Sequence, residues 1–372
     1  MCIRVSKLYP SQFTNAPVFT VWNYKGGTGK TTLTFQLSTA YAQQHPQEKI
    51  VVIDMCPQAD VSSVLLANIR PCQRGVNDST EPMVIQNEVS YRKTVYGYLL
   101  ASLEGNCIEQ GNSNFIDFLY RVNSKNSLIP KNLLLMCGDL RLEAFSRRLE
   151  HERLQRTSND NPWKKVTLLI KDYIEGISRQ NTEYVFFIDT NPTFSVYTEM
   201  AISAAERLIV PFNANDFSLS AIRGVFNLVY GYPTDENERF KEYEYNCLAE
   251  ANSIQRPKLH LLVNNRATYY HTRASAAYSA VEIEVRRFLS TCYFKNEHMF
   301  TSQSLFESRP GILVDYIMDV PDFHTAGVVS THNGWPLLIL SAGTYSVFDK
   351  KVQVNNIIDK YKTDLRKVVQ RL

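Results

Sequence analysis

The sequence contains no pair of cysteines in the C-x-x-C spacing. Its seven cysteines are scattered at positions 2, 56, 72, 107, 137, 247 and 292. This pattern argues against a zinc ribbon and fits a reduced, cytosolic compartment. No apolar run approaches the length of a transmembrane helix, and the N-terminus lacks the apolar core of a signal peptide. We therefore expect a cytoplasmic protein.

A strong excess of one charge is also absent, since 40 Lys and Arg against 37 Asp and Glu give a net charge of +3. This value does not by itself define a nucleic-acid-binding protein, so any basic surface must be local. Residues 1–17 are too few for a helix-turn-helix domain. With 44% hydrophobic and 21% charged residues, the 372-residue chain has the composition of a globular protein. Its length allows one large α/β domain or two smaller ones.

The most informative segment is residues 18–32. Val18 to Trp22 predict a strand, a turn containing three glycines follows, and an amphipathic helix begins after Lys30-Thr31-Thr32. This order is typical of a phosphate-binding loop. Glycines let successive backbone N–H groups point at phosphate oxygens, and the N-terminus of the helix adds partial positive charge. Lys30 is expected to reach the terminal phosphates and the Thr31 hydroxyl to take one position on Mg²⁺.

The strict pattern G-x-x-x-x-G-K-[ST] is not met, because Tyr24 stands where the first glycine belongs. Instead a second lysine opens the loop, in the order Lys25-Gly26-Gly27-Thr28-Gly29-Lys30-Thr31-Thr32. This segment resembles the deviant Walker A loop of the ParA/MinD family of ATPases. The resemblance implies that residues 25–32 bind ATP with Mg²⁺ and that the protein forms a homodimer with ATP. It also implies that Lys25 reaches the nucleotide of the partner subunit, so that Lys25 and Lys30 both act in catalysis.

Two further apolar runs end in aspartate. Ile50 to Asp54 and Tyr184 to Asp189 predict buried parallel strands, and ligands of open α/β sheets lie at the carboxyl ends of such strands. Asp189 occupies the Walker B position and is expected to hold Mg²⁺ through water. Asp54 is expected to point to the same ion together with Thr31. The alternative for Asp54 is a side chain that only caps the next turn.

Cys56 departs from the family. At this point the family usually carries Asp-x-Asp-Pro-Gln, and Asp54, Pro57 and Gln58 match, but Cys56 replaces the second aspartate, which orients the attacking water. A thiol is a poor acceptor for a water proton, so catalysis by the usual route is in doubt. Three alternatives remain for this catalytic position: a thiolate beside Mg²⁺, another residue that positions the water, or a redox role.

The resemblance also predicts how the base is bound. Asn264 follows the strand Leu259 to Val263 and matches the base-binding asparagine of the family, although asparagine is also a common turn former. Pro321 lies in the segment that packs against the base in the family. The arginine that usually follows this proline is replaced by Asp322.

The alternation of strands and helices predicts an α/β fold with a doubly wound, mostly parallel sheet and helices on both faces. We expect one ATPase domain over residues 1–372, with an inserted or expanded region at about 70–165. A terminal helix is expected over about 348–372, with an apolar stripe and many lysines and arginines. This helix has three interpretations: a packed helix with a solvated face, a non-specific DNA-binding surface, or reversible membrane attachment.

The resemblance therefore implies a ParA-like, ATP-dependent dimerising switch that binds DNA non-specifically and partitions or positions a plasmid, a chromosome or other cargo. A ParB-like or other cargo-bound activator is the expected partner, and the protein would be nucleoid-associated if it binds DNA. Membrane association, as in MinD-like positioning ATPases, is the less favoured alternative. An ATP-bound scaffold with weak hydrolysis is another, because of Cys56. A metallocluster carrier would need paired cysteines, which the spacing does not offer.

Overall fold

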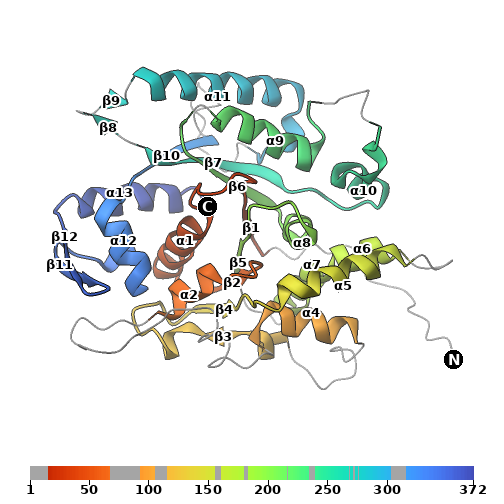
Figure 1. The fold of residues 1–372 in the computed structure, drawn as a ribbon, viewed down its shortest axis with the longest axis horizontal. Helices are drawn as coiled ribbons and strands as arrows, with labels where there is room; N and C mark the ends of the chain where they lie inside the picture. Colours follow the sequence, from red (N-terminus) through yellow and green to blue (C-terminus); the bar gives the residue numbers. More distant parts are fainter. Residues whose placement is uncertain are drawn as a thin grey trace.

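The computed structural model centres on an eight-stranded sheet in the order β10-β7-β6-β1-β5-β2-β4-β3 (Figure 1). The neighbouring strands run parallel, except that β3 is antiparallel to β4. The strands are β1 Val18–Val21, β2 Lys49–Asp54, β3 Tyr120–Arg121, β4 Leu133–Met136, β5 Tyr184–Asp189, β6 Arg207–Phe212, β7 Lys258–Ala267 and β10 Ile317–Pro321. The structure describes residues 16–67, 93–104, 115–155, 161–179, 183–215, 217–233, 239–267, 269–270, 273–274, 276–302 and 316–372. The segment 70–92 of the expected insertion lies outside the described residues.

Helices cover both faces of the sheet (Figure 1). One face packs against α1 Lys30–Gln44, α2 Asp60–Leu66, α12 His324–Asn333 and α13 Ile358–Val369. The other packs against α4 Val95–Leu103, α5 Leu142–Leu154, α6 Pro162–Thr167, α7 Leu169–Ser178, α8 Val196–Ala204, α9 Ser218–Tyr230, α10 Tyr245–Ala251 and α11 Ala276–Lys295. The doubly wound fold expected from the alternating pattern is confirmed. Among the described helices, none combines the length and apolar character that crossing a membrane requires.

The central strands are apolar on both sides, as their continuous hydrophobic runs predict. In β5, Tyr184, Phe186 and Ile188 belong to the core on one face, while Val185 and Phe187 belong to the core on the other. Such strands are buried between two helical layers, and their carboxyl ends meet at one edge of the sheet. Asp54 at the end of β2 and Asp189 at the end of β5 are direct register partners there.

The C-terminal segment differs from the expectation of a helix over 348–372. Residues Gly343–Val347 and Lys350–Val354 form an antiparallel hairpin, β11 and β12, and the helix α13 begins only at Ile358. The reversal takes two residues, with Phe348 at φ 49° in the left-handed region that two-residue hairpin turns favour. Lys350 and Lys351 therefore lie on a strand. In α13 the expected apolar stripe is buried against the core, through Ile358, Tyr361, Leu365, Val368 and Val369.

The fold depends on a buried amide between distant segments. Asn126 is fully buried, and its Nδ2 donates to the carbonyls of Leu65 (3.1 Å) and Gly334 (2.8 Å), close to the ends of α2 and α12. Replacing Asn126 by alanine leaves two carbonyls without this donor. We expect Asn126→Ala to lower the free energy of unfolding by about 2–4 kcal/mol. Urea unfolding checks this value against the exposed control Asn356→Ala, for which a change of about 0.5 kcal/mol or less is expected. Equal losses in the two variants would contradict the role given to Asn126.

Candidate functional site: a phosphate loop at the carboxyl edge of the sheet

The glycine-rich turn joins β1 to α1 where the sequence predicts it. Gly27 and Gly29 have φ values of 73° and 85°, which glycine adopts without strain. A Cβ on Gly29 would also overlap the side-chain amide of Asn265. Gly26 and Gly27 are exposed, whereas Thr28 is buried. The turn is therefore a tight loop with an open outer side, directly in front of the N-terminus of α1.

Three asparagines that sequence reasoning missed hold this loop. Each lies near the carboxyl end of a strand of the central sheet, and each forms a side-chain hydrogen bond with the loop backbone. They are Asn23, whose Oδ1 accepts from the N–H of Lys25 (3.0 Å), Asn213, whose Nδ2 donates to the carbonyl of Gly27 (3.1 Å), and Asn265, whose Nδ2 donates to the carbonyl of Thr28 (2.9 Å). The loop conformation is thus fixed from β1, β6 and β7 together.

The two lysines of the loop point in different directions. Lys30 is buried, and its Nζ turns into the loop and donates to the carbonyl of Lys25 (3.2 Å). Burial lowers the pKa of Lys30, while the charge of Asp189 acts in the opposite direction. The Nζ of Lys25 instead lies on the rim, where it donates to Oδ1 of Asn215 (2.6 Å) and stands 5.6 Å from the ring centroid of Phe217. One ammonium group therefore faces the inside of the loop and the other its outer surface.

Asp189 is fully buried, and its carboxylate accepts hydrogen bonds from two threonine hydroxyl groups. Thr31 donates to Oδ2 (2.9 Å) and Thr34 to Oδ1 (3.0 Å). Burial and the neighbouring Asp54 raise the pKa of Asp189 well above its ordinary value. Hydroxyl and carboxylate oxygens are the ligands that Mg²⁺ takes, and a cation beside this carboxylate would relieve the cost of its burial. The residues at this position thus fit a magnesium ion.

Asp54 accepts hydrogen bonds through both of its carboxylate oxygens. Its Oδ1 accepts from the N–H of Cys56 (3.0 Å), and its Oδ2 accepts from the N–H (3.0 Å) and the hydroxyl (2.7 Å) of Ser62. Ser62 in turn accepts from the N–H of Gly138 (2.9 Å). Both oxygens of Asp54 therefore hold the turn that leads into α2. This arrangement agrees with the alternative that Asp54 caps the next turn, while coordination of the metal by Asp54 stays a prediction.

Cys56 follows Asp54 by two residues and is close enough to Asp189 and Lys30 to interact electrostatically with both. Its side chain is buried, and burial together with Asp54 raises the pKa of the thiol well above its ordinary value. Without a cation beside it, the thiol is therefore neutral at neutral pH, and a thiolate beside Mg²⁺ stays an alternative. A neutral thiol offers only a weak acceptor to a water molecule, so the residue at this position lacks the basicity of the carboxylate it replaces.

A cavity of about 290 Å³ adjoins the loop at the start of α1. Its lining comes from the loop and α1, from the end of β7, and from the segment after β10, through Gly29, Thr32, Asn265, Asp322, Phe323, His324, Gly327, Val328 and Thr331. Asn264 does not line it, because successive residues of a strand point to opposite sides; the Nδ2 of Asn264 donates to Oδ1 of Asp319 (2.9 Å). Pro321 is buried at the end of β10, directly before the lining residue Asp322.

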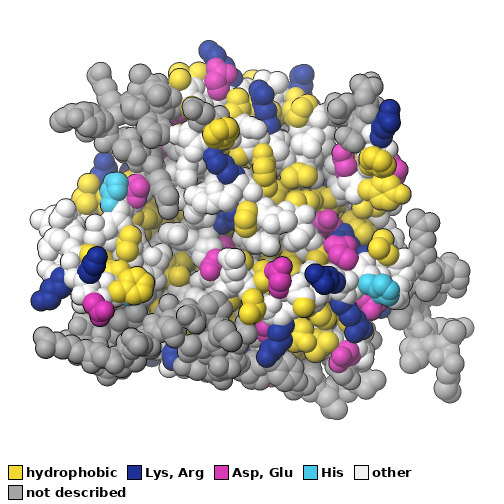
Figure 2. Space-filling model, viewed as in Figure 1, with side chains coloured by type: hydrophobic (Ala, Val, Ile, Leu, Met, Phe, Trp, Pro, Cys, Tyr) yellow, Lys and Arg dark blue, Asp and Glu magenta, His cyan; other side chains and the backbone are white. Residues whose placement is uncertain are grey.

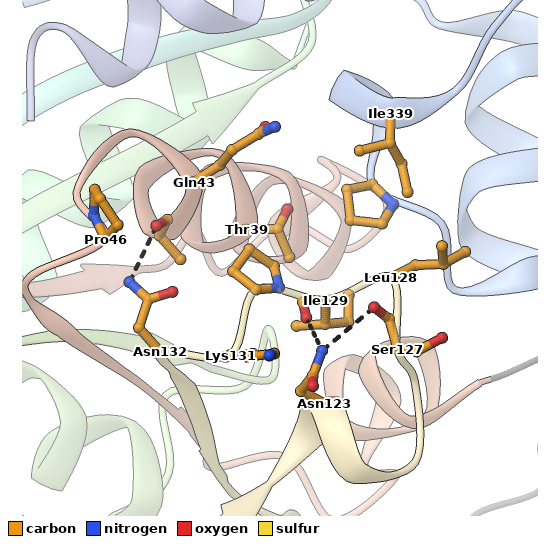
Figure 3. A pocket seen from close by; sticks show the side chains of 13 residues that line it. Thr39, Gln43, Pro46, Asn123, Ser127, Leu128, Ile129, Lys131, Asn132 and Ile339 are labelled. Atoms are coloured by element: carbon orange, nitrogen blue, oxygen red, sulfur yellow. Dashed lines mark hydrogen bonds between the residues drawn. The ribbon is translucent and has the colours of Figure 1, made fainter.

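A second cavity, of about 490 Å³, lies at the other end of α1 (Figure 3). It is formed by the C-terminal half of α1, the chain between β3 and β4, and the segment around Ile339. In Figure 3 the amide of Asn123 bonds within the wall of this cavity, to the carbonyls of Ser127 and Ile129. None of the residues that the sequence predicts to bind nucleotide lines it.

The comparisons with known proteins agree with this geometry. A family model described as "AAA domain" matches residues 16–241, more than half of the chain. The chain therefore belongs to this family, and the predicted resemblance to ParA/MinD-type P-loop ATPases is confirmed. A search of curated proteins found no significant match.

Solved structures share the fold at low sequence identity. The ATP complex of a variant of Cyanothece McdA has a TM-score of 0.59 at 13% identity, over 96% of this chain and 96% of that chain. Apo McdA has a TM-score of 0.54 at 14% identity, over 86% and 91%. A putative plasmid partition protein from Borrelia burgdorferi, bound to AMPPNP, has a TM-score of 0.51 at 14% identity, over 96% and 100%.

Proposed function

We propose that the protein is an ATP-dependent switch in which two copies associate around bound ATP, and that it partitions or positions a cargo such as a plasmid or a chromosome. The similar fold of McdA and of a plasmid partition protein, solved with ATP and with an ATP analogue, supports this proposal. A cargo-bound activator, ParB-like or other, is the expected partner.

The observation that carries the proposal is the opposite orientation of the two loop lysines. Lys30 faces inward and can neutralise the β- and γ-phosphates within its own protomer. Lys25 lies on the rim beside Phe217, a residue that is 71% exposed. A cation and an exposed aromatic ring at the mouth of the site suit a surface that meets a second copy, where Lys25 would reach the phosphates of the partner.

The remaining residues take roles that follow from their positions. The N–H groups of residues 26–32 and the N-terminus of α1 would bind phosphate oxygens. Thr31 and Asp189 would hold Mg²⁺, which neutralises charge on the phosphates when bound, while Asp54 keeps the following turn in place. The base would occupy the cavity lined by Asn265 and Asp322, so we assign to Asn265 the base contact first expected of Asn264.

Cys56 makes slow hydrolysis, or an ATP-bound scaffold, the second candidate function. We expect Cys56→Asp to raise the turnover number for ATP about tenfold or more. A positioned general base typically raises the rate about 10²–10⁴-fold. A carboxylate at position 56 would recover only part of this gain, because the charge of the neighbouring buried Asp54 disfavours its ionised form. Phosphate release under saturating ATP measures the effect, and Cys56→Ser, which supplies no carboxylate, is the matched control. Equal turnover in all three proteins would show that another group orients the water.

DNA is the better candidate than a membrane for the surface that the switch binds. The apolar stripe of α13 is buried within the protein, so it is not exposed to insert into a bilayer. In α13 itself, Lys362 pairs with Asp359 (3.7 Å) and Lys367 with Asp364 (2.8 Å), which reduces its positive potential. Lys350 and Lys351 on β12 are exposed and have no such partner among the described residues. On the face drawn in Figure 2, Lys and Arg side chains are interspersed with Asp and Glu side chains.

DNA binding is tested through its dependence on salt. With ATP and Mg²⁺, we expect the affinity for DNA of mixed sequence to fall as salt rises, without binding to anionic vesicles. The double variant Lys350→Ala/Lys351→Ala should weaken binding uniformly across DNA sequences. The slope of log affinity against log salt concentration should fall by about 1 for each phosphate that the variant no longer neutralises. The control Lys165→Ala/Lys171→Ala removes the same charge from helices on the opposite face of the sheet. An unchanged slope in the β12 variant, or binding to vesicles alone, would contradict this assignment.

A further inference from the structure

The cavity beside the phosphate loop contains two polar groups whose hydrogen-bonding direction is fixed by the protein. Asn265 uses its Nδ2 to donate to the carbonyl of Thr28 (2.9 Å), which orients its amide and leaves Oδ1 as the atom available to a ligand. Asp322 accepts the N–H of His324 through Oδ1 (2.8 Å), and no described residue donates to its Oδ2. Both groups therefore offer acceptors.

This cavity is placed to hold the base of a nucleotide whose phosphates lie in the loop. Gly29 and Thr32 of the loop and the first turn of α1 form one wall, and Asp322 with the first half of α12 forms another. Its volume of about 290 Å³ is close to the lower end of the range of small-molecule sites, about 300 Å³. A planar base, rather than a whole nucleotide, matches that size.

We propose that Asp322 determines which base the protein binds, by accepting a hydrogen bond from the 6-amino group of adenine. The inference rests on the proposed binding of ATP and adds the residue that selects the base. A 6-oxo purine places a carbonyl oxygen where the amino group would be, so that two acceptors face each other. His324, whose Nδ1 lies 3.6 Å from Oδ1 of Asp322, and Thr32 can each donate or accept, so they do not impose the same selection.

The comparison of ATP with ITP tests this contact, because an oxygen replaces the 6-amino group in ITP. The neighbouring ring atom N1 also changes, from an acceptor in adenine to a protonated donor in the 6-oxo base. Titration calorimetry with Mg²⁺ is expected to give a preference for ATP of about tenfold. A site that hydrogen-bonds a group of one ligand discriminates against an analogue that lacks this group. The Asp322 side chain is 34% exposed, so solvent weakens this discrimination.

Asp322→Asn is the informative variant. The new amide oxygen can still accept the N–H of His324, which turns the amide nitrogen toward the cavity as a donor. We expect the preference for ATP over ITP to fall below threefold, mainly through tighter binding of ITP. Asp349→Asn removes the same charge from the exposed turn of the β11–β12 hairpin and should keep the preference of the unmodified protein.

The outcomes separate the two proposals. The role of Asp322 is wrong if the unmodified protein binds ATP and ITP equally, or prefers ITP or GTP. It is also wrong if Asp322→Asn keeps the original preference for ATP. In each of these cases the proposed binding of a nucleotide still stands. If neither ATP nor ITP binds, the proposed function fails as well. Thermal unfolding of each variant confirms that the comparison is made between folded proteins.

Discussion

Replacing Lys30 by alanine is expected to lower the affinity for ATP at least about 100-fold, or about 2.8 kcal/mol. The ammonium group of Lys30 is buried inside the phosphate loop, where its interaction with phosphate oxygens is only weakly screened. Without ATP, the same group carries a burial cost that lowers its pKa. The substitution should therefore leave the free energy of unfolding unchanged or raise it. Titration calorimetry with ATP and Mg²⁺, together with urea unfolding, measures both quantities.

Lys30→Met separates charge from packing, because methionine preserves most of the aliphatic stem. We expect it to lose affinity to the same extent as Lys30→Ala. If Lys30→Met binds ATP within about threefold of the unmodified protein, the loop does not hold phosphates in the way described.

Replacing Lys25 by alanine is expected to abolish association of two copies with ATP while changing the affinity of each protomer for ATP less than about threefold. Lys25 contributes to the rim rather than to the inside of its own loop, and its Nζ interacts with Asn215 and Phe217. Across an interface it would pair with phosphates of the other copy, and removing one partner of such a pair costs about 3–5 kcal/mol. Sedimentation velocity with a non-hydrolysable ATP analogue measures the association.

Asn215→Ala provides a control at the same place. It removes the hydrogen bond that holds Lys25 within its own protomer but keeps the charge of Lys25. Association with ATP should therefore be retained. Loss of association in Asn215→Ala and its persistence in Lys25→Ala would reverse the assignment.

The sheet and the position of the phosphate loop could be predicted from the sequence because they follow from local patterns. Runs such as Tyr184 to Ile188 are too apolar for any place except between two helical layers. An aspartate at the end of each run then lies at the edge of the sheet where the loop also lies. The register that aligns Asp54 with Asp189 follows from pairing of β2 and β5.

The function of individual polar side chains was harder to predict, because it depends on distant partners. Asn264 and Asn265 look equivalent in the sequence, yet strand alternation turns one toward Asp319 and the other toward Thr28. Asp54 was expected to point to the metal, and the sequence gives no signal for its hydrogen bonds with Ser62. Ser62 lies eight residues further along the chain, and its N–H and hydroxyl both donate to Oδ2 of Asp54.

The C-terminal segment was predicted only in part, for a different reason. The apolar spacing from Val354 to Leu372 is helical, and α13 follows it from Ile358 onward. The preceding residues form a hairpin without an Asn-Gly or Asp-Gly turn, so the usual sequence signal is absent. Packing of β11 and β12 against α12 compensates for this weak turn signal.

The most direct test of the account is a structure of the protein with Mg²⁺ and a non-hydrolysable ATP analogue. We predict two copies face to face, with the triphosphate inside the loop against Lys30 and with Lys25 released from Asn215 and bound to phosphates of the other copy. An empty loop, or a nucleotide bound in a single protomer with Lys25 still on Asn215, would contradict the proposal that two copies share their nucleotides.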